Sequence, residues 1–549
     1  MFKVRSRDRR GLHCSTIDDR GGSLLKRESI KRVDMEIWLI GIGILGAFTY
    51  VIVKNSVSKI TKTPIWLLWL VLMSPPLIVT GWIIIHEGKV PMPLPVFIGL
   101  CVLSLMLYWW IVRLGRVPPT EKEVNAVEKV PNTPDLALEA LDTAAKNPIT
   151  RPITPEEEKS LRDCFPWGVY YLQNIDYRPQ AILCRGKLRS VPDEAYKIVK
   201  GNVERVFSDR FLVLFQESFQ GQPFFALIAN PWAKNAESPV EEKLSRPGIS
   251  VILLLLTLFT TTIVGMEFSG VTTEQVETTL ELFGDGFTLP ALDANLALIA
   301  RGLPYSLALL VILGVHEMSH YLAALQYKIR ATLPYFIPVP FFLGTFGAFI
   351  QMRSPTPHRK ALFDVAVAGP LGGFLIAVPL LLWGLSLSEV VPIDAQSGLL
   401  DFETLNPRFS FLLSILAKIA LGSRLVVGQA IDLHPLAVAG YVGIIVTALN
   451  LMPVGQLDGG HIVHAIYGTK TAIVVGQLTR LLMFILAFVQ PDFLLWAIIL
   501  LLMPAADQPA LDDVTELDNK RDALGLVSLA LLLLILLPLP GAVATWFGM

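Results

Sequence analysis

Long apolar runs are the feature of this sequence that most limits what the chain can fold into. Nine stretches approach the length of about 20 residues that a helix needs to cross a bilayer. They lie near 37–53, 64–85, 94–112, 249–265, 303–325, 361–387, 435–452, 471–503 and 524–540. Of the 549 residues, 53% are hydrophobic and 17% charged, against roughly 45–50% and 25% in soluble domains. The sequence therefore predicts a polytopic α-helical membrane protein embedded in a lipid bilayer.

Charge and cysteine content exclude several other classes of protein. The formal net charge is −1, whereas a nucleic-acid binder needs a clustered excess of Lys and Arg, so no nucleic-acid partner is expected. The four cysteines, Cys14, Cys101, Cys164 and Cys184, form no CxxC pair. They therefore predict neither a disulfide framework nor a zinc site built from thiolates.

Charge density divides the chain into five segments. Residues 1–34 carry ten Lys or Arg against five Asp or Glu and no apolar run, which is typical of a disordered tail. Residues 35–112 are predicted to form N-terminal transmembrane helices, and 113–246 a soluble domain. Residues 247–505 are the predicted membrane core, and 506–549 a polar loop followed by a C-terminal transmembrane helix.

The predicted soluble domain combines strands with one helix. Strand-like patches lie at 169–172, 181–183, 211–215 and 224–228, and a helical stretch runs from about 192 to 206. No run in 113–246 is long enough to span a bilayer. We therefore expect one small α+β domain.

An H-E-x-x-H motif lies inside the apolar run from Leu303 to Ala324. On a helix, His316 and His320 are four residues apart and project from one face, where both imidazoles can bind a single zinc ion. Glu317 lies beside them, in the position of a general base that takes a proton from water. Packed core histidines with a paired Glu are the structural alternative, but ionisable groups at hydrocarbon depth are costly and mark functional sites.

A second polar cluster follows the apolar run 435–449. Asn450, Gln456 and Asp458 are its carboxamide and carboxylate groups, and Pro453 with several glycines interrupts the helix. Broken helix at membrane depth is tolerated where it lines a cavity or is buried in protein, although an ordinary helix end is the alternative. A catalytic zinc site usually has three protein ligands. The third must come from outside the 303–324 helix, and this is the next polar cluster at membrane depth.

Together, H-E-x-x-H at 316–320 and N-x-x-P-x-x-x-x-D-G at 450–459 resemble the motifs of the site-2 proteases, zinc metalloproteases that cut substrates within the bilayer. The resemblance implies a site-2 protease membrane core in which His316, His320 and Asp458 ligate one zinc ion per chain. It also implies that Glu317 is the general base and that Asn450 contacts the substrate or the developing oxyanion.

The resemblance covers the membrane core from about 300 to 505. Residues 344–351 are similar to a membrane-dipping hairpin of the family, and residues 368–373 (Ala-Gly-Pro-Leu-Gly-Gly) to a motif in the next span. Gly344, Gly347 and Phe349 of the hairpin, together with Pro453, are therefore expected to bind substrate. We hypothesise that a substrate helix unwinds and pairs like a strand with the edge of the 341–352 hairpin.

Three segments, 344–347, 450–460 and 508–515, look like the cyanobacterial and plant-chloroplast subgroup of this family. This predicts a multi-pass protein of a cyanobacterial-type plasma or thylakoid membrane, with a chloroplast membrane as the alternative. Many bacterial members insert a PDZ domain between the two motif helices, but the polar loop 388–408 is too short for one. The 113–246 domain is the candidate regulator instead, with a role in folding or assembly as the alternative.

The predicted function is that of an intramembrane zinc endopeptidase. Its substrate partner would be a membrane-bound regulatory protein cut within a transmembrane helix, in regulated intramembrane proteolysis. One alternative is a membrane metal carrier whose transport site uses the same four residues at 316, 317, 320 and 458, but such carriers usually show internal repeats. A catalytically inactive scaffold is the second alternative.

Basic residues next to the spans predict the orientation of the chain. Arg113 and Arg116 lie at the start of the 113–246 domain, next to the preceding span, and Lys243 and Arg246 lie at its end. This predicts that the domain is in the cytosol or, in a plastid, the stroma. Counting spans backward from there puts residues 1–34 on the outer side, where a tail of net charge +5 is disfavoured. We therefore expect the biological chain to begin at Met35.

Overall fold

The computed structural model places most of the chain in two compact units, Met1–Asn147 and Pro148–Met549. It describes residues 43, 46, 49–50, 63–86, 94–114, 153–178, 181–218, 221–230, 247–272, 275–276, 289–339, 342–393, 402, 405–489, 493–504, 507–541 and 543–544. The predictions for residues 1–34, for the start at Met35 and for most of the 37–53 run lie outside these residues.

The first unit contains a pair of apolar helices, α2 (Ile65–Ile85) and α3 (Leu94–Leu114). Both agree with predicted runs. Two adjacent prolines lie inside α2, and the Ser104 hydroxyl of α3 donates to the Val71 carbonyl of α2 at 2.6 Å. A hydroxyl of a neighbouring helix thus contacts the backbone just before the prolines, one of the ways in which membrane helices accommodate proline.

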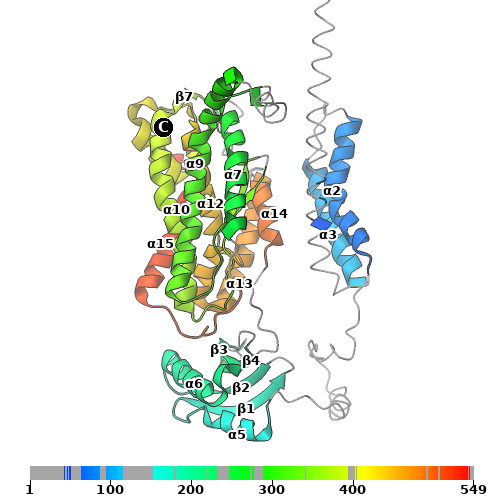
Figure 1. The fold of residues 1–549 in the computed structure, drawn as a ribbon, viewed down its shortest axis with the longest axis vertical. Helices are drawn as coiled ribbons and strands as arrows, with labels where there is room; N and C mark the ends of the chain where they lie inside the picture. The colour runs from blue at the N-terminus through cyan, green and yellow to red at the C-terminus, as the bar shows by residue number, and fades with distance from the viewer. Residues whose placement is uncertain are drawn as a thin grey trace, which may run out of the picture. The chain divides into compact units, whose positions relative to one another are not determined.

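The second unit contains a bundle of apolar helices. Helices α7 (Pro247–Phe268), α9 (Leu289–Gln326), α10 (Arg359–Leu387) and α12 (Pro435–Asn450) run alongside one another (Figure 1). In the described part of the chain, five helices are long and apolar enough to cross a membrane: α2, α7, α9, α10 and α13 (Asp458–Val489). The chain is therefore a multi-pass helical membrane protein, as the apolar runs predicted.

Small residues let the bundle helices approach closely. Gly440 of α12 lies against the Leu381 backbone of α10, and Gly384 of α10 lies against Ala437 of α12, so that a Cβ at either glycine would overlap its neighbour. Helices in lipid gain little from burying apolar surface against each other and depend on such close packing. The tight contact with α10 thus fixes the position of α12, which ends at Asn450 of the polar cluster.

Shorter elements complete the second unit. The apolar run 471–503 is divided between α13, which kinks at Gly468 (φ 82°), and α14 (Leu494–Leu502). The run at 524–540 lies largely in α15 (Asn519–Leu536). Part of the polar loop expected at 388–408 is instead strand β7 (Glu389–Pro392). This strand pairs antiparallel with β8 (Gln429–Asp432), and α11 (Phe411–Leu421) lies between the two strands in the sequence.

The soluble part of the second unit has the predicted α+β composition. Its antiparallel sheet has the strand order β1-β2-β4-β3. The strands and helices are α5 (Pro155–Asp163), β1 (Tyr170–Arg178), β2 (Ala181–Leu188), α6 (Pro192–Phe207), β3 (Phe211–Glu217) and β4 (Pro223–Ala229). Buried and partly buried residues alternate along β3, and the buried rings of Phe215 and Phe225 stack with centroids 4.3 Å apart. Strand alternation and one amphipathic helix thus build a core of its own.

A short C-terminal segment, residues 507–515, connects this sheet to the helical bundle. The N–H of Phe215 in β3 donates to the Leu511 carbonyl at 2.6 Å, and the Asp513 N–H donates to the Phe215 carbonyl at 2.9 Å. On its other side, the Leu511 N–H donates to the Thr356 carbonyl at 2.9 Å. We call residues 507–515 the linker segment, because it pairs with both the sheet edge and the loop before α10.

Candidate metal centre

Helix α9 presents three ionisable side chains together in its apolar sequence. His316, Glu317 and His320 are all buried, with 3%, 8% and 7% of their surface exposed. The 3.6-residue period places the two imidazoles one turn apart, and their Nε2 atoms lie 3.2 Å from each other. The helix alone therefore assembles a two-nitrogen donor pair.

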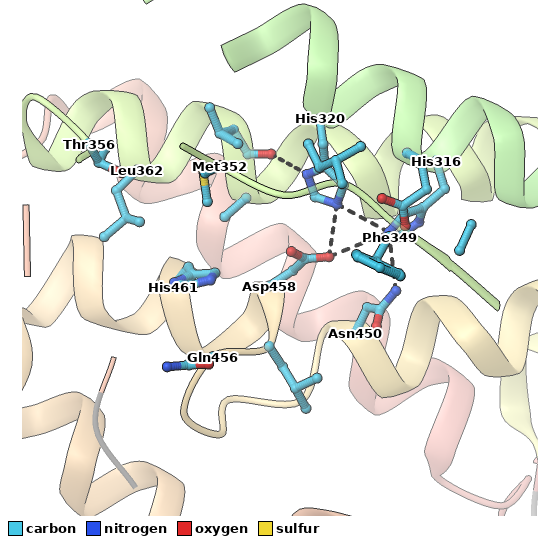
Figure 2. A pocket seen from close by; sticks show the side chains of 16 residues that line it. His316, His320, Phe349, Met352, Thr356, Leu362, Asn450, Gln456, Asp458 and His461 are labelled. Atoms are coloured by element: carbon cyan, nitrogen blue, oxygen red, sulfur yellow. Dashed lines mark hydrogen bonds and ion pairs between the residues drawn. The ribbon is translucent and has the colours of Figure 1, made fainter. Parts of the chain in front are cut away.

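Asp458 completes the cluster from the first turn of α13. Its Oδ2 lies 3.5 Å from Nε2 of His316 and 3.3 Å from Nε2 of His320. The turn between α12 and α13 requires Gly455, whose φ of 52° lies in the left-handed region that favours glycine. Figure 2 shows both imidazoles reaching toward Asp458 and Asn450, which come from the opposite side of the site.

The three donor groups have the spacing of a zinc site. Two imidazole nitrogens and one carboxylate oxygen lie within 4.8 Å of one another. Zinc binds nitrogen and oxygen ligands at about 2.0–2.2 Å in tetrahedral geometry, which separates neighbouring ligand atoms by about 3.3–3.6 Å. The three measured separations, 3.2, 3.3 and 3.5 Å, match those of ligands on adjacent corners of a tetrahedron. The donor chemistry and the spacing both fit zinc.

Helix α10 fixes the orientation of the histidines. Nδ1 of His320 lies 2.7 Å from the Val365 carbonyl, which accepts a hydrogen bond from the Nδ1–H group. Nε2 is thereby left unprotonated and able to bind a metal. Gly369 and Gly373 lie directly against the rings of His320 and His316, where a Cβ at Gly369 would overlap the ring. The 368–373 motif thus has a packing role that its resemblance to the family did not specify, and nothing in the sequence pointed to Val365.

Asn450 and Glu317 flank the donor cluster, which is the set of metal-binding groups of His316, His320 and Asp458. The Asn450 side-chain nitrogen lies 3.1 Å from Nε2 of His316, at the C-terminal end of α12. The Glu317 carboxylate accepts a hydrogen bond from the Ile350 backbone, just beyond strand β6 (Thr345–Phe349). One amide donor and one carboxylate therefore stand beside the donor cluster.

A cavity of about 270 Å³ opens onto these residues. The donor cluster, Glu317 and Asn450 line it together with residues of β6, α10 and the start of α13 (Figure 2). Of the four residues predicted to bind substrate, Phe349 lines the cavity, whereas Gly344, Gly347 and Pro453 are not among its lining residues. Gly344, with φ 78°, instead packs against Thr261 of α7, where a Cβ would overlap the backbone.

The predicted hairpin is formed by β6 and an earlier strand, β5 (Tyr335–Pro338). The two strands pair antiparallel, with Tyr335 opposite Phe349 and Phe336 opposite Ala348. The Tyr305 hydroxyl of α9 donates to the Leu343 carbonyl at 2.9 Å, and the Thr260 hydroxyl of α7 donates to Gly344 at 2.7 Å. Two helices therefore hold the hairpin beside the cavity.

Two more histidines on α13 belong to a neighbouring polar network. Nδ1 of His461 and Nδ1 of His464 lie 2.7 and 2.8 Å from Oδ2 of Asp507. No pattern in the sequence connects these two histidines with the linker segment. Asp507 is more than forty residues away along the chain, and its position in the polar loop gave no signal.

Comparison with known proteins finds a family domain and several relatives. Residues 304–489 match Peptidase family M50. The chain is 29% identical over 70% of its length to Probable zinc metalloprotease EGY1, chloroplastic, of Arabidopsis thaliana, covering 72% of that protein. It is 29% identical over 69% of its length to Probable zinc metalloprotease EGY2, chloroplastic, of the same plant. It is 30% identical over 66% of its length to Probable zinc metalloprotease EGY1, chloroplastic, of Oryza sativa subsp. japonica.

The last two alignments cover 64% and 63% of the relatives' lengths, slightly less than two thirds. No solved structure matches the chain. The matched region, 304–489, contains both motif helices and all three groups of the donor cluster. The chain therefore contains a Peptidase family M50 domain, the domain of the site-2 proteases, and is similar over about two thirds of its length to plant zinc metalloproteases.

Proposed function

We propose that this protein is an intramembrane zinc endopeptidase that cleaves a transmembrane segment of a membrane-bound regulatory protein. The observation that carries the proposal is the donor cluster itself, whose two histidines lie inside an apolar helix long enough to span a bilayer and which opens onto a cavity. A protein without catalytic or binding chemistry has no reason to keep these desolvated groups together.

His316, His320 and Asp458 would hold one zinc ion per chain. When bound there, zinc would polarise a peptide carbonyl and acidify water. Glu317 accepts the proton of the attacking water, because its carboxylate lines the same cavity and the Ile350 backbone orients it. The Asn450 amide donates a hydrogen bond to the oxygen that becomes negative during attack, a contribution often worth about 3–4 kcal/mol.

The hairpin supplies a place for an unwound substrate. A transmembrane helix hides its carbonyls in internal hydrogen bonds, so it must open before it can be cut. In the described part of the chain, β6 pairs with β5 alone, which leaves its other edge available for strand-like pairing. Phe349 at the end of β6 lines the cavity, and we assign it to substrate contact. Gly344 and Gly347 act by shaping the hairpin, and Pro453 by shaping the turn before Asp458.

Residues 113–246 would form a regulatory domain in a cytosolic or stromal compartment. The linker segment joins its sheet to the loop before α10, and Thr356 of that loop lines the cavity. The plant relatives are named as chloroplastic proteins, which supports a chloroplast membrane, with a cyanobacterial-type plasma or thylakoid membrane as the other proposed location.

The Glu317→Gln variant tests the proposal. Purified wild type should hold about one zinc per chain and cut a transmembrane substrate, whereas Glu317→Gln should keep zinc and lose cleavage. His316→Ala and Asp458→Ala should lose most of the zinc as well. A metal carrier would transport zinc across vesicles and cut nothing, so cleavage by wild type excludes that alternative. Proteomic comparison of membranes with wild type and Glu317→Gln would then reveal the substrate, which should accumulate uncut in the variant.

A further inference from the structure

His461 is a polar side chain of the cavity for which the mechanism above has no use. It lies one turn beyond Asp458 on α13 and lines the cavity, with 16% of its side chain exposed. Its Nδ1 lies 2.7 Å from Oδ2 of Asp507, and among the described residues its Nε2 has no hydrogen-bond partner. Figure 2 shows the ring beside Asp458.

Asp507 holds this ring from a fixed position. Its side chain is 4% exposed, and it accepts hydrogen bonds from His461, from His464 and from the N–H of Gln508 at 2.6 Å. Burial works against ionisation of Asp507, but the hydrogen bonds from His461 and His464 outweigh it and lower the pKa of the carboxyl to about 2. Asp507 is therefore an ionised acceptor with a defined orientation.

His464 anchors Asp507 in turn. Its ring is fully buried, and its Nε2 lies 2.9 Å from Oδ1 of Asp513, so both nitrogens donate to carboxylates. The Thr469 hydroxyl donates to the other oxygen of Asp513 at 2.9 Å. Burying several ionisable groups costs free energy, and only a fully hydrogen-bonded network offsets that cost. Among the described residues, one histidine nitrogen of this network has no partner: Nε2 of His461, whose ring lines the cavity.

The hydrogen bond to Asp507 determines what His461 can offer. A carboxylate only accepts, so Nδ1 carries a proton, and in the neutral tautomer with this proton Nε2 is an acceptor. A peptide extended beside the metal cluster exposes both N–H and C=O groups after leaving its helix. Asn450 provides a donor for a carbonyl, but an unpaired N–H in a water-poor cavity costs about 1–3 kcal/mol. His461 is the acceptor that such an N–H needs.

We propose that His461 contacts the substrate by accepting a hydrogen bond from one backbone N–H close to the scissile bond, and that Asp507 is the positioning residue that aims it. The proposal rests on the proposed proteolytic function. A second metal site is not the explanation, because within the described residues only His316, His320 and Asp458 have metal-ligand spacing.

The test removes the N–H from the substrate and the acceptor from the enzyme. A synthetic transmembrane peptide that wild type cleaves is prepared as a series, each member N-methylated at one position around the cut. Methylation of one amide nitrogen other than that of the scissile bond should lower kcat/KM by about tenfold for wild type. The same methylation should have less than a twofold effect for His461→Leu, whose kcat/KM is already about tenfold low. Asp507→Asn should behave like His461→Leu, and the double variant should be no worse than either single variant.

Matched measurements separate this contact from a structural role. His461→Gln, which keeps a side-chain acceptor, should recover part of the activity and of the methylation effect. Thr515→Val removes a hydrogen bond to Asp512 in the same linker segment. This variant should keep the activity and the methylation effect at wild-type values. Zinc content should be unchanged in His461→Leu. Equal methylation penalties in wild type and His461→Leu at every position would overturn the proposal, as would zinc loss in that variant. Failure of wild type to cut any transmembrane peptide would instead overturn the proposed function.

Discussion

At the scale of single residues, the metal cluster depends on residues that contribute no ligand. Gly369 of α10 leaves room for the His320 ring, and the Val365 carbonyl one turn earlier fixes its Nδ1. A helix interior disfavours glycine by about 1 kcal/mol relative to alanine, so a glycine here needs a reason. The reason is contact with an imidazole whose orientation determines whether Nε2 faces Asp458.

Gly369→Ala should therefore damage the metal site although alanine is the better helix former. The added methyl group overlaps the His320 ring, which must rotate away from the cluster. We expect the zinc content of the purified variant to fall by more than half and peptide cleavage to fall at least tenfold. Gly248→Ala at the start of α7 has open space around its new methyl group and serves as the control. Normal zinc content in Gly369→Ala would contradict this account.

At the scale of elements, the linker segment is the junction between the soluble sheet and the membrane bundle. Leu511 takes part in both attachments, with its carbonyl bonded to Phe215 and its N–H bonded to Thr356. Gln216 of β3 also donates to the Ala510 carbonyl at 2.7 Å. The sheet edge is thereby covered by a segment from the far end of the sequence, which protects an otherwise unpaired strand.

Leu511→Pro should weaken this junction. Proline removes the N–H that bonds to Thr356, which costs about 1–3 kcal/mol if the carbonyl finds no other donor. Limited proteolysis should then cut the segments flanking residues 153–230 faster than in wild type. Leu511→Ala keeps the N–H and loses part of the side-chain packing, so it measures how much packing contributes. Cleavage at the same rate in Leu511→Pro and Leu511→Ala would show that the hydrogen bond is unimportant.

The thiols of the sheet domain give a second prediction at this scale. Burial raises the pKa of the Cys184 thiol to about 12, well above the value of about 8.5 in an unfolded chain. Because the folded domain holds this proton more tightly than the unfolded chain, the buried neutral thiol contributes its full stabilisation below pH 8.5. This contribution is lost as the pH rises toward 12. The unfolding temperature of the domain should therefore fall above pH 9. At pH 7.5, a maleimide should label Cys184 only after unfolding, and rapid labelling of the native protein would contradict the buried position.

At the scale of the whole molecule, the linker segment bears on the orientation of the second unit. It joins the soluble sheet to Thr356, which lies in the connection between α9 and α10. This connection carries Lys328, Arg330 and Arg353, basic residues that favour the cytosolic side of a membrane. Arg359, at the start of α10, is buried instead, with its Nε bonded to the Ala465 carbonyl at 2.8 Å. Two independent considerations thus place the soluble domain on the same side as that connection.

Sided proteolysis tests this orientation. In sealed right-side-out vesicles, protease added outside should leave residues 153–230 intact, and opening the vesicles should expose them. An epitope placed in the 388–408 loop should show the reverse accessibility. Digestion of the soluble domain from outside would invert the entire topology, including the assignment of the basic connections to the inner side.

The sequence by itself determined the membrane class, the soluble α+β composition and the i, i+4 histidine pair, because apolar length, strand alternation and helix periodicity are local properties. Motif resemblance added Asp458 and Asn450. Only the tertiary structure determined how the site is supported, since those contacts join residues distant in sequence. His320 and Val365 are 45 residues apart, His461 and Asp507 are 46, and Gln216 and Ala510 are 294. No local pattern predicts such pairs, because packing of the whole chain selects each partner.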